Sequence, residues 1–304
     1  MPEHFIYHQE APSLRSPVLI AAFKGWNDAA ESASASVTFL AQEWGARKVA
    51  SLDGEEFYDY SQTRPQVRVT DGEFRAIDWP ELNIFAYADV ALDRDVVLLV
   101  GHEPNLRWKS FNKALLEVID RLGITEAVLL GALLADVPHT RDPNVVGVSS
   151  DAALRGRLDD MGVAFPRYEG PTGIVGVLQD AWGRRGLPTT SLWGNVPHYI
   201  TASPNQQVQA VLLRHVDRMF DLRLNIRQIE RQARRFRSRV DEAIEQNPEA
   251  LAYVRELERR ATDETSSPTR SPLPTGPEVV KALEEFLQRQ QRGDDAPDAD
   301  DFDE

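Results

Sequence analysis

The stretch Ala127-Val-Leu-Leu-Gly-Ala-Leu-Leu-Ala-Asp-Val-Pro-His-Thr-Arg141 decides the fold class of this 304-residue chain. It is apolar at every position up to Ala135 and turns abruptly polar at Asp136. A run without alternation predicts a strand that is buried on both faces, as in the middle of a parallel sheet. Ligands of such sheets usually bind in the loops that follow the carboxyl ends of the strands. The same stretch therefore predicts the fold and the place where function resides.

Similar apolar runs recur along the chain and alternate with segments of helical periodicity. The predicted strands cover residues 17–23, 47–52, 82–88, 95–101, 126–134, 144–149 and 187–194. Helices are expected between them, one with Pro171 in its first turn and a long one that opens at Ser203-Pro204. Strands that alternate with helices indicate βαβ units. We therefore predict an α/β core over residues 1–218, with a mostly parallel or mixed sheet flanked by helices.

The periodicity changes after the core. A heptad of apolar residues runs from Met219 to Ala243, breaks at Asn247-Pro248 and resumes as a helical stripe, which predicts an antiparallel helical hairpin over 219–265. Its first arm carries arginines at 223, 227, 231, 234, 235, 237 and 239. We interpret this arm as a solvated or partner-facing helix. A linker over 266–276, a short amphipathic helix over 277–292 and a disordered acidic tail over 293–304 are expected to follow.

The composition excludes several classes of function. The chain contains no Cys, so it has no disulfides, thiolate metal sites or Cys nucleophile. A net charge of −14 disfavours nucleic acid as a partner, because phosphate backbones require a positive surface. No apolar run approaches the ~20 residues that span a bilayer. These features predict a cytoplasmic protein that does not bind membranes.

Chemistry-bearing residues gather in the loops after the predicted strands. Loops 25–28, 101–108, 136–141 and 195–199 should meet at one edge of a parallel sheet, with the turn at 169–172 nearby. The candidate polar cluster comprises Asn27, Asp28, His102, Glu103, Arg107, Asp136, His139, Arg141, Glu169, Thr172 and His198. Acids, bases and cations of this kind are what a hydrolase or transferase uses.

The spacing of these residues is not specific for an enzyme. No Gly-x-Ser-x-Gly elbow, P-loop or Gly-x-Gly-x-x-Gly motif occurs. Three His and one Asp could bind a metal, but their spacing matches no recognised ligand pattern, so we expect neither a metal nor a cofactor. A structural role is the simpler interpretation: Asn27 or Asp28 caps the following helix, and Asp136 and His139 brace a tight turn through mutual hydrogen bonds.

Several of these motifs together resemble a known family. They are Lys24-Gly-Trp-Asn-Asp-Ala29, Gly54-Glu-Glu-Phe-Tyr-Asp59, Gly101-His-Glu-Pro104 with Arg107-Trp108, Ala135-Asp-Val-Pro-His-Thr140, Tyr168-Glu-Gly-Pro-Thr-Gly173 and Val196-Pro-His-Tyr199. In this order, over about residues 5–220, they resemble the bacterial branch of the proteasome assembly chaperone family, the family of the second eukaryotic assembly chaperone. The arginine-rich hairpin and acidic tail resemble its actinobacterial members.

The resemblance implies a phosphorylase/hydrolase-like α/β core and a homo-oligomer, trimers among them. Relatives in eukaryotes and archaea bind proteasome α-subunits, some through a C-terminal hydrophobic-Tyr-any signal. The sequence ends in Phe302-Asp303-Glu304, with Asp in place of that Tyr, so we expect no docking of this kind.

Two hypotheses follow. The first is a non-catalytic, protein-binding homo-oligomer, with a trimer favoured and proteasome α-subunits as the candidate partner. The alternative is a small-ligand-binding protein or a hydrolase/transferase-like enzyme that uses the polar loops.

Overall fold

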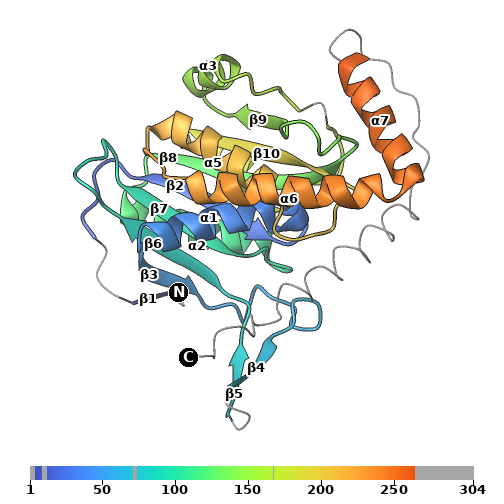
Figure 1. Cartoon of the computed structure of the whole chain (residues 1–304). Helices are drawn as coiled ribbons and strands as arrows, with labels where there is room; N and C mark the ends of the chain where they lie inside the picture. Colours follow the sequence, from blue (N-terminus) through green and yellow to red (C-terminus); the bar gives the residue numbers. More distant parts are fainter. Residues whose placement is uncertain (1–3, 9–11, 71–73, 167, 264–304) are drawn as a thin grey trace, which may run out of the picture.

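An eight-stranded mixed sheet forms the centre of the molecule, in the strand order β1-β3-β6-β7-β2-β8-β10-β9 (Figure 1). The computed structural model describes residues 4–8, 12–70, 74–166 and 168–263. Four central strands are mutually parallel: β7 (Val96–His102), β2 (Val18–Lys24), β8 (Glu126–Ala135) and β10 (Thr189–Pro197). The flanking strands are antiparallel: β1 (Phe5–Tyr7), β3 (Arg47–Leu52), β6 (Leu82–Tyr87) and β9 (Val145–Ser149). The predicted α/β class with a mixed sheet is confirmed.

Strand β8 is the apolar run that indicated the fold. It pairs with β2 on one side and with β10 on the other, so its backbone groups are bonded along both edges. Val128, Leu129 and Leu130 are fully buried, because helices cover both faces of the sheet. Gly131 follows, and the ring of its cross-strand partner Trp193 lies so close that a Cβ on Gly131 would stand 2.4 Å from it.

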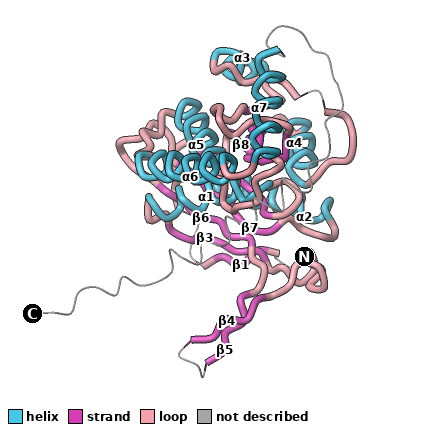
Figure 2. The backbone as a smooth tube through the Cα atoms, turned by 45° about the vertical axis from the view of Figure 1, so that its right-hand side comes forward, coloured by secondary structure: helices cyan, strands magenta, loops and turns pink. Residues whose placement is uncertain are grey.

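Helices form a layer on each face of the sheet (Figure 2). One face packs against α2 (Trp108–Leu122) and α4 (Ile174–Arg184). The other packs against α1 (Ser32–Glu43), which follows the short 3-10 turn η1 (Ala29–Glu31), and α5 (Gln206–Phe220). Helix α3 (Ala152–Asp160) packs beside β9. Successive residues of a strand point to opposite faces, so Leu19 enters the first core and Ile20 the second.

Two helix starts differ from the prediction. Pro171 was expected in the first turn of α4, but that helix begins only at Ile174, after Gly173 in an extended conformation. Ser203-Pro204 was expected to open α5, but the helix begins at Gln206. The side chain of Asn205 there accepts hydrogen bonds from the backbone N–H groups of Gln207 and Val208. In both cases the proline lies before the helix, and a later residue, Gly173 or Asn205, occupies the N-cap position.

Helices α6 (Arg227–Glu245) and α7 (Pro248–Asp263) follow the core. The apolar stripe of α6 serves two neighbours: Ile229 joins the core under α1 and α5, whereas Phe236 and Val240 pack with α7, Tyr199 and Ile200. The side chain of Asn247 caps α7 by accepting from the N–H groups of Glu249 and Ala250. The division into domains at 218/219 stays a prediction. The predicted linker 266–276, helix 277–292 and tail 293–304 lie outside the described residues.

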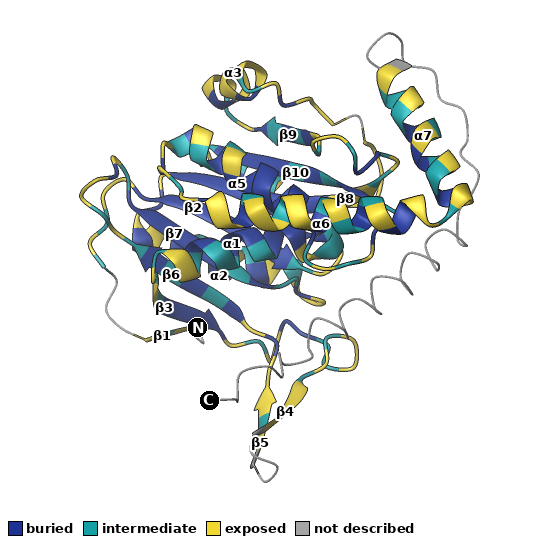
Figure 3. Cartoon of the chain, in the orientation of Figure 1, coloured by how far each residue is buried: buried dark blue, intermediate teal, exposed yellow. Residues whose placement is uncertain are grey.

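A two-stranded antiparallel ribbon, β4 (Gln66–Thr70) with β5 (Phe74–Asp78), projects from the sheet domain (Figure 3). The pairing Val67↔Ile77 and the two-residue period of strands place Val67, Val69 and Ile77 on one face. All three are more than half exposed. This ribbon is the most apolar exposed sheet surface among the described strands.

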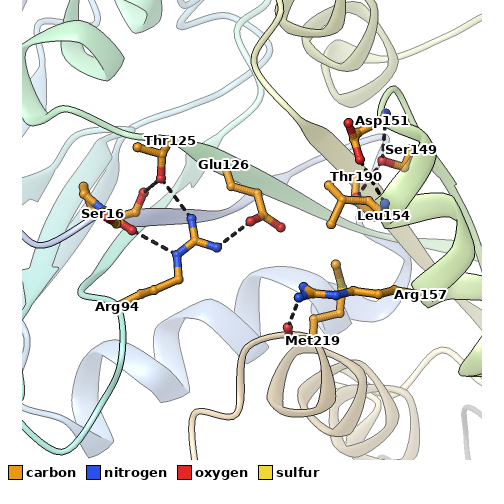
Figure 4. Close-up of polar contacts among 11 residues, drawn as sticks. Ser16, Arg94, Thr125, Glu126, Ser149, Asp151, Leu154, Arg157, Thr190 and Met219 are labelled. Atoms are coloured by element: carbon orange, nitrogen blue, oxygen red, sulfur yellow. Dashed lines mark hydrogen bonds and ion pairs between the residues drawn. The ribbon is translucent and has the colours of Figure 1, made fainter.

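Polar contacts close the opposite, amino-terminal edge of the parallel strands (Figure 4). Arg94 donates to the carbonyl of Ser16 at 3.0 Å and to the hydroxyl of Thr125 at 2.9 Å, and it pairs with Glu126. Arg157 on α3 donates to the carbonyl of Met219 at the end of α5. The amino-terminal edge is therefore occupied by structural contacts, and the carboxyl edge remains for function.

Candidate functional site

The four predicted loops do meet at the carboxyl edge of the parallel strands, because β7, β2, β8 and β10 are adjacent and run in the same direction. The edge has two parts. We call Gly25–Asp28, the loop after β2, and Gly101–Trp108, the end of β7 with the loop after it, the open half. We call Asp136–Arg141, the loop after β8, and Asn195–Tyr199, the end of β10 with the loop after it, the covered half, because α6 and α7 pack onto them.

In the open half, Asp28 caps α1, as one of the two capping interpretations predicted. Its carboxylate accepts from the N–H groups of Ala33 at 2.7 Å and Ser34 at 3.2 Å. Burial of the carboxyl group raises the pKa of Asp28 to about 6, and the hydrogen bonds from Ser34 and Ala33 oppose that shift. A buried carboxylate at a helix start has a structural function that the sequence pattern anticipates.

Glu103 and Asn27 lie together at the start of α4. Glu103 Oε1 accepts from the N–H of Ile174 at 2.7 Å, so a carboxylate from the loop after β7 caps a helix 71 residues away. Asn27 is fully buried beside Gly173, where a Cβ would stand 2.2 Å from its Oδ1. Neither side-chain amide atom of Asn27 has a hydrogen-bond partner among the described residues. Only glycine at position 173 leaves room for this asparagine.

His102 and Arg107 complete the open half. The carbonyl of His102 accepts from the hydroxyl of Tyr58 at 3.0 Å, and its Nδ1 is buried without a partner among the described residues. Burial lowers the pKa of His102, and the charge of Lys24 acts in the same direction, so the ring is neutral at pH 7. Arg107 adopts a positive φ of 54° before α2 and pairs with Glu56 at 2.6 Å.

In the covered half, His139 is the centre of a buried hydrogen-bonded chain. Tyr199 Oη accepts from the backbone N–H of His139 at 2.8 Å and lies 2.7 Å from its Nδ1. His139 Nε2 lies 3.0 Å from Asp241 Oδ1 on α6. The tautomer follows from this network: the hydroxyl of Tyr199 donates to Nδ1, and Nε2–H donates to Asp241. Burial lowers the pKa of His139, which keeps the ring neutral.

His198 forms a second chain of the same kind. Its Nδ1 lies 3.2 Å from Asp136 Oδ1, and its Nε2 lies 3.2 Å from the hydroxyl of Tyr253 on α7. The rings of His139 and His198 both contact the ring of Tyr199 edge-on. The ring centroids of His139 and His198 lie 5.8 and 5.6 Å, respectively, from that of Tyr199. Two Tyr–His–Asp chains therefore join the sheet edge to the two helices.

The structure corrects one prediction about this loop. Asp136 and His139 were expected to brace a tight turn by bonding each other, but Asp136 pairs with His198 and His139 pairs with Tyr199 and Asp241. The rest of the loop also contacts α7: Thr140 donates to the carboxylate of Glu258, and Arg141 donates to its carbonyl at 3.0 Å. This loop braces α6 and α7, which its sequence alone does not indicate.

Glu169 and Thr172 are not drawn into either hydrogen-bonded chain. Both are exposed in the segment before α4, and the hydroxyl of Thr172 donates to the carbonyl of Gly173 at 3.4 Å. Of the predicted cluster, the structure therefore unites Asn27 and Glu103 at α4, and Asp136, His139, Arg141 and His198 at α6 and α7.

Sequence reasoning missed the residues that complete the covered half. Tyr199 was noted only as the end of a motif, and Asp241, Tyr253 and Glu258 were assigned to a hairpin with no link to the sheet edge. Each is polar within an apolar stripe or next to one, and that pattern could have marked them as buried partners. Their partners lie 55 to 118 residues away, which no local pattern encodes.

The chemistry available at this edge is limited. Among the described residues no group of three or more His, Asp or Glu side chains is placed to hold a metal ion. In the same part of the chain, no helix has the length and apolar character needed to cross a membrane. Most of the polar side chains already bind backbone or one another, which leaves few groups that could act on a substrate.

Large apolar side chains are exposed at the same edge. They come from the loop after β2, the loop after β7, the end of β8 and the segment before α4, and they are Trp26, Leu106, Leu133, Leu134, Phe165 and Tyr168. Trp26 is 65% exposed and Leu134 is 59% exposed. Leu134 lies beyond Leu130, the last β8 residue that pairs with β2. Several large apolar side chains exposed at the ends of parallel strands are typical of protein-binding surfaces.

Comparisons with known proteins agree with this picture. The model of the PAC2 family matches residues 22–244. The chain is similar to a PAC2 family protein from Streptomyces avermitilis, with 40% identity, 78% of this chain and 99% of that chain covered, and a TM-score of 0.71. It is similar to a Mycobacterium tuberculosis proteasome-assembly chaperone homologue, with 41% identity, the same coverage and a TM-score of 0.71.

A more distant likeness concerns the fold alone. PbaB of Pyrococcus furiosus, an archaeal proteasome activator, is 17% identical, with 78% of this chain and 97% of that chain covered and a TM-score of 0.61. A comparison with curated proteins gives no match.

Proposed function

The chain belongs to the PAC2 family, and from that premise we propose that it is a protein-binding chaperone of the proteasome-assembly type. The observation that carries this proposal is the contrast between polar and apolar side chains at the carboxyl edge of the sheet. Polar side chains there bind the chain's own backbone and helices, whereas Trp26, Leu106 and Leu134 are exposed. The partner that we propose is a proteasome α-subunit.

The exposed side chains have the chemistry of an interface. Aromatic and large aliphatic residues are enriched at the centres of protein–protein interfaces, where a few of them supply most of the binding energy. The large ring of Trp26 lies on a loop that two neighbouring side chains hold in place. Asp28 accepts a hydrogen bond from the first turn of α1, and Asn27 packs against Gly173 at the start of α4. An anchored loop loses little conformational freedom on binding, which favours affinity.

The polar contacts support a role without catalysis. A general base needs a free lone pair within reach of a substrate. Glu103 Oε1 accepts from the backbone N–H of Ile174 in the first turn of α4, and His139 is 2% exposed with both ring nitrogens engaged. These contacts position α4, α6 and α7, so we assign them to the architecture of the binding surface.

We further propose that the protein acts as a homo-oligomer, with a trimer favoured, and that the β4–β5 ribbon contributes to self-association. An isolated two-stranded ribbon is at best marginally stable in water. The exposed face of Val67, Val69 and Ile77 would gain stability by packing against another copy. Sedimentation of Val67→Asp/Ile77→Asp should give a smaller species than the unmodified chain, and an unchanged mass would assign self-association to another surface.

The chaperone role is tested with a binding measurement on a matched set of variants. Trp26→Ser/Leu134→Ser should weaken binding to purified proteasome α-subunits at least tenfold, which is about 1.4 kcal/mol or more. Val90→Ser is the control, because Val90 is 95% exposed in the loop before β7, at the opposite edge of the sheet. Unchanged assembly of proteasome rings in a deletion strain would exclude the proteasome role.

A second function is favoured by one observation: the amide of the buried Asn27 and the Nδ1 atom of His102, both in the open half, are each buried without a hydrogen-bond partner among the described residues. These groups could bind a small polar ligand, as in the small-ligand-binding or hydrolase/transferase-like alternative. Native mass spectrometry of the purified protein tests this: a retained mass that disappears in Asn27→Ala would support it, and the bare protein mass would reject it.

A further inference from the structure

The exposed face of α6 carries a row of arginines. Arg227, Arg231, Arg234 and Arg235 are all exposed, and no ion pair or hydrogen bond joins any of them to another described residue. We call these four residues the arginine row. Other arginines nearby do have partners: Arg214 lies 3.9 Å from Glu230, and Arg237 lies 3.8 Å from Asp241.

The arginine row is unfavourable for the helix itself. Arg227, Arg231 and Arg235 are four residues apart, and like charges at this spacing repel by roughly 0.2–0.5 kcal/mol per pair. They also occupy the amino-terminal half of α6, where the helix dipole favours acids, while Asp241, Glu242 and Glu245 occupy the other half. An anionic partner bound along the row would reverse both effects.

A polar groove of about 420 Å³ runs beside the row, between α1, the approach to α5 and α6. Its polar lining includes five glutamines, Gln42, Gln206, Gln209, Gln228 and Gln232. At 100° per residue, Gln228 and Gln232 lie between the arginine row and the buried Ile229, so the row forms one rim of the groove.

The groove suits a peptide in an extended conformation. Amide side chains both donate and accept hydrogen bonds, as a peptide backbone does. Gln206 Oε1 is buried without a partner among the described residues, and it can accept one such bond. The charged groups in the lining, Lys24 and Glu31, lie 3.7 Å apart and offset each other. The arginine row therefore provides the net charge of the site.

We propose that the groove and the arginine row dock the acidic segment Gly293–Glu304 of the same chain. This segment has no basic residue and seven acidic ones: Asp294, Asp295, Asp298, Asp300, Asp301, Asp303 and Glu304. It thus holds half of the net charge of −14. Carboxylates pair with the guanidinium groups of the rim, and the backbone bonds the glutamines of the groove.

The tether is long enough for this contact. Helix α7 ends at Asp263. Residues 264–276 reach at most roughly 45 Å when extended, and the helix predicted over 277–292 adds roughly 25 Å, so the tether spans up to roughly 70 Å. At 1.5 Å per residue, the path from Asp263 along α7 and back along α6 to Arg231 is roughly 45 Å. Tethering gives the segment an effective concentration of the order of millimolar, so even a weak contact is populated.

The experiment uses a fluorescent peptide of sequence 293–304 and two forms of the protein, the full chain and the chain that ends at residue 292. The truncated chain should bind the peptide, and the full chain should bind it at least tenfold more weakly because its own segment occupies the groove. Affinity for the truncated chain should fall at least tenfold when NaCl is raised from 50 to 300 mM. Equal binding to both forms, or no binding, would overturn the proposal.

Matched variants locate the contact. Arg231→Gln/Arg235→Gln in the truncated chain should weaken peptide binding at least tenfold, and Gln228→Leu/Gln232→Leu should weaken it without a change of charge. Arg47→Gln/Arg64→Gln removes two exposed arginines outside the groove and should leave binding unchanged. A peptide with Asn in place of Asp tests the charges without touching the fold.

Equal effects of the two arginine pairs would reduce the contact to general charge and overturn the site. A short DNA duplex that binds the truncated chain more tightly than the peptide would instead assign the arginine row to nucleic acid.

Discussion

The two halves of the carboxyl edge begin with the same kind of sequence and end in different roles. Each has an apolar strand followed by a histidine, an acid and an arginine, namely His102, Glu103 and Arg107 in the open half and Asp136, His139 and Arg141 in the covered half. In the covered half these side chains hold α6 and α7. In the open half Glu103 holds α4, while Trp26 and Leu106 remain exposed.

The difference shows what decides the role of a polar loop after a strand. The loop chemistry is similar, but only the covered half is met by helices that bring acids and tyrosines of their own, Asp241, Tyr253 and Glu258. Among the described residues, no such helix packs onto the loops of the open half, and apolar side chains there stay exposed. The proposed binding surface therefore consists of Trp26 and Leu106 in the open half and Leu134 at the end of β8, where the chain does not cover its own side chains.

Tyr199→Phe should have the largest effect on stability, because it removes a buried hydroxyl at the centre of the covered half. The hydroxyl of Tyr199 serves both the backbone N–H and Nδ1 of His139, and its loss leaves two buried groups unpaired. At 1–3 kcal/mol for each unpaired group, the free energy of unfolding should fall by about 2–6 kcal/mol. Urea denaturation of the pure protein measures it.

Tyr253→Phe is the control for this substitution. Tyr253 is only half-buried and its hydroxyl has one partner, His198, at 3.2 Å, so the loss should be about 1 kcal/mol. Equal losses in the two variants would show that burial does not distinguish the two Tyr–His–Asp chains.

His139 in the covered half and Asp28 in the open half should change stability with pH in opposite directions. Burial lowers the pKa of His139 below 6.5, so the unfolded chain binds more protons near that pH and stability falls as pH drops through 6.5. Burial raises the pKa of Asp28 from 3.8 to about 6, so the folded chain binds more protons there and stability rises as pH drops from 6 toward 4.

Urea unfolding measured from pH 7.5 to 4.5 separates the two groups. His139→Gln should lessen the loss of stability on acidification, and Asp28→Asn should increase it, each by at most about 1.4 kcal/mol per pH unit for one proton. A change of the same sign in both variants would contradict the opposite effects of His139 and Asp28.

The sequence predicted the frame of this site better than its contacts. The run Ala127–Ala135 is sufficient for the buried strand, because a strand that is apolar on both faces needs helices on both sides. The positions of His102, His139 and His198 at one edge follow from parallel pairing alone. Asp28 as a helix cap is a local interaction within six residues, so the local pattern was enough.

The partners of these residues could not be predicted because the contacts are non-local. Asp136 and His139 are three residues apart and could have bonded each other. Instead, both ring nitrogens of His139 bond distant residues, the buried Tyr199 and the half-exposed Asp241, which are 60 and 102 residues away in the sequence. Pro171 was misplaced for a related reason: Glu103, from a distant strand, caps the first turn of α4 and thereby sets the start of the helix at Ile174.

Glu103→Ala should cost less than Tyr199→Phe and should act on the open half. It removes the carboxylate that accepts from Ile174 N–H at 2.7 Å, and the loss of a helix cap costs about 1 kcal/mol. Glu55→Ala, an exposed acid with no helix to cap, serves as the control and should change stability by less than about 0.5 kcal/mol. Hydrogen exchange should locate the effect in the first turn of α4. Faster exchange spread over α6 and α7 would mean that the two halves are coupled.

Trp26→Ser should have the smallest effect on stability, and it tests directly whether the open half is free to bind a partner. Trp26 is 65% exposed, so its substitution should change the free energy of unfolding by no more than about 0.5 kcal/mol. The same substitution should weaken binding of a protein partner, because the ring is buried only in the complex. A loss above about 1.5 kcal/mol in the isolated chain would show that Trp26 packs within the fold, and the open half would then be covered like its neighbour.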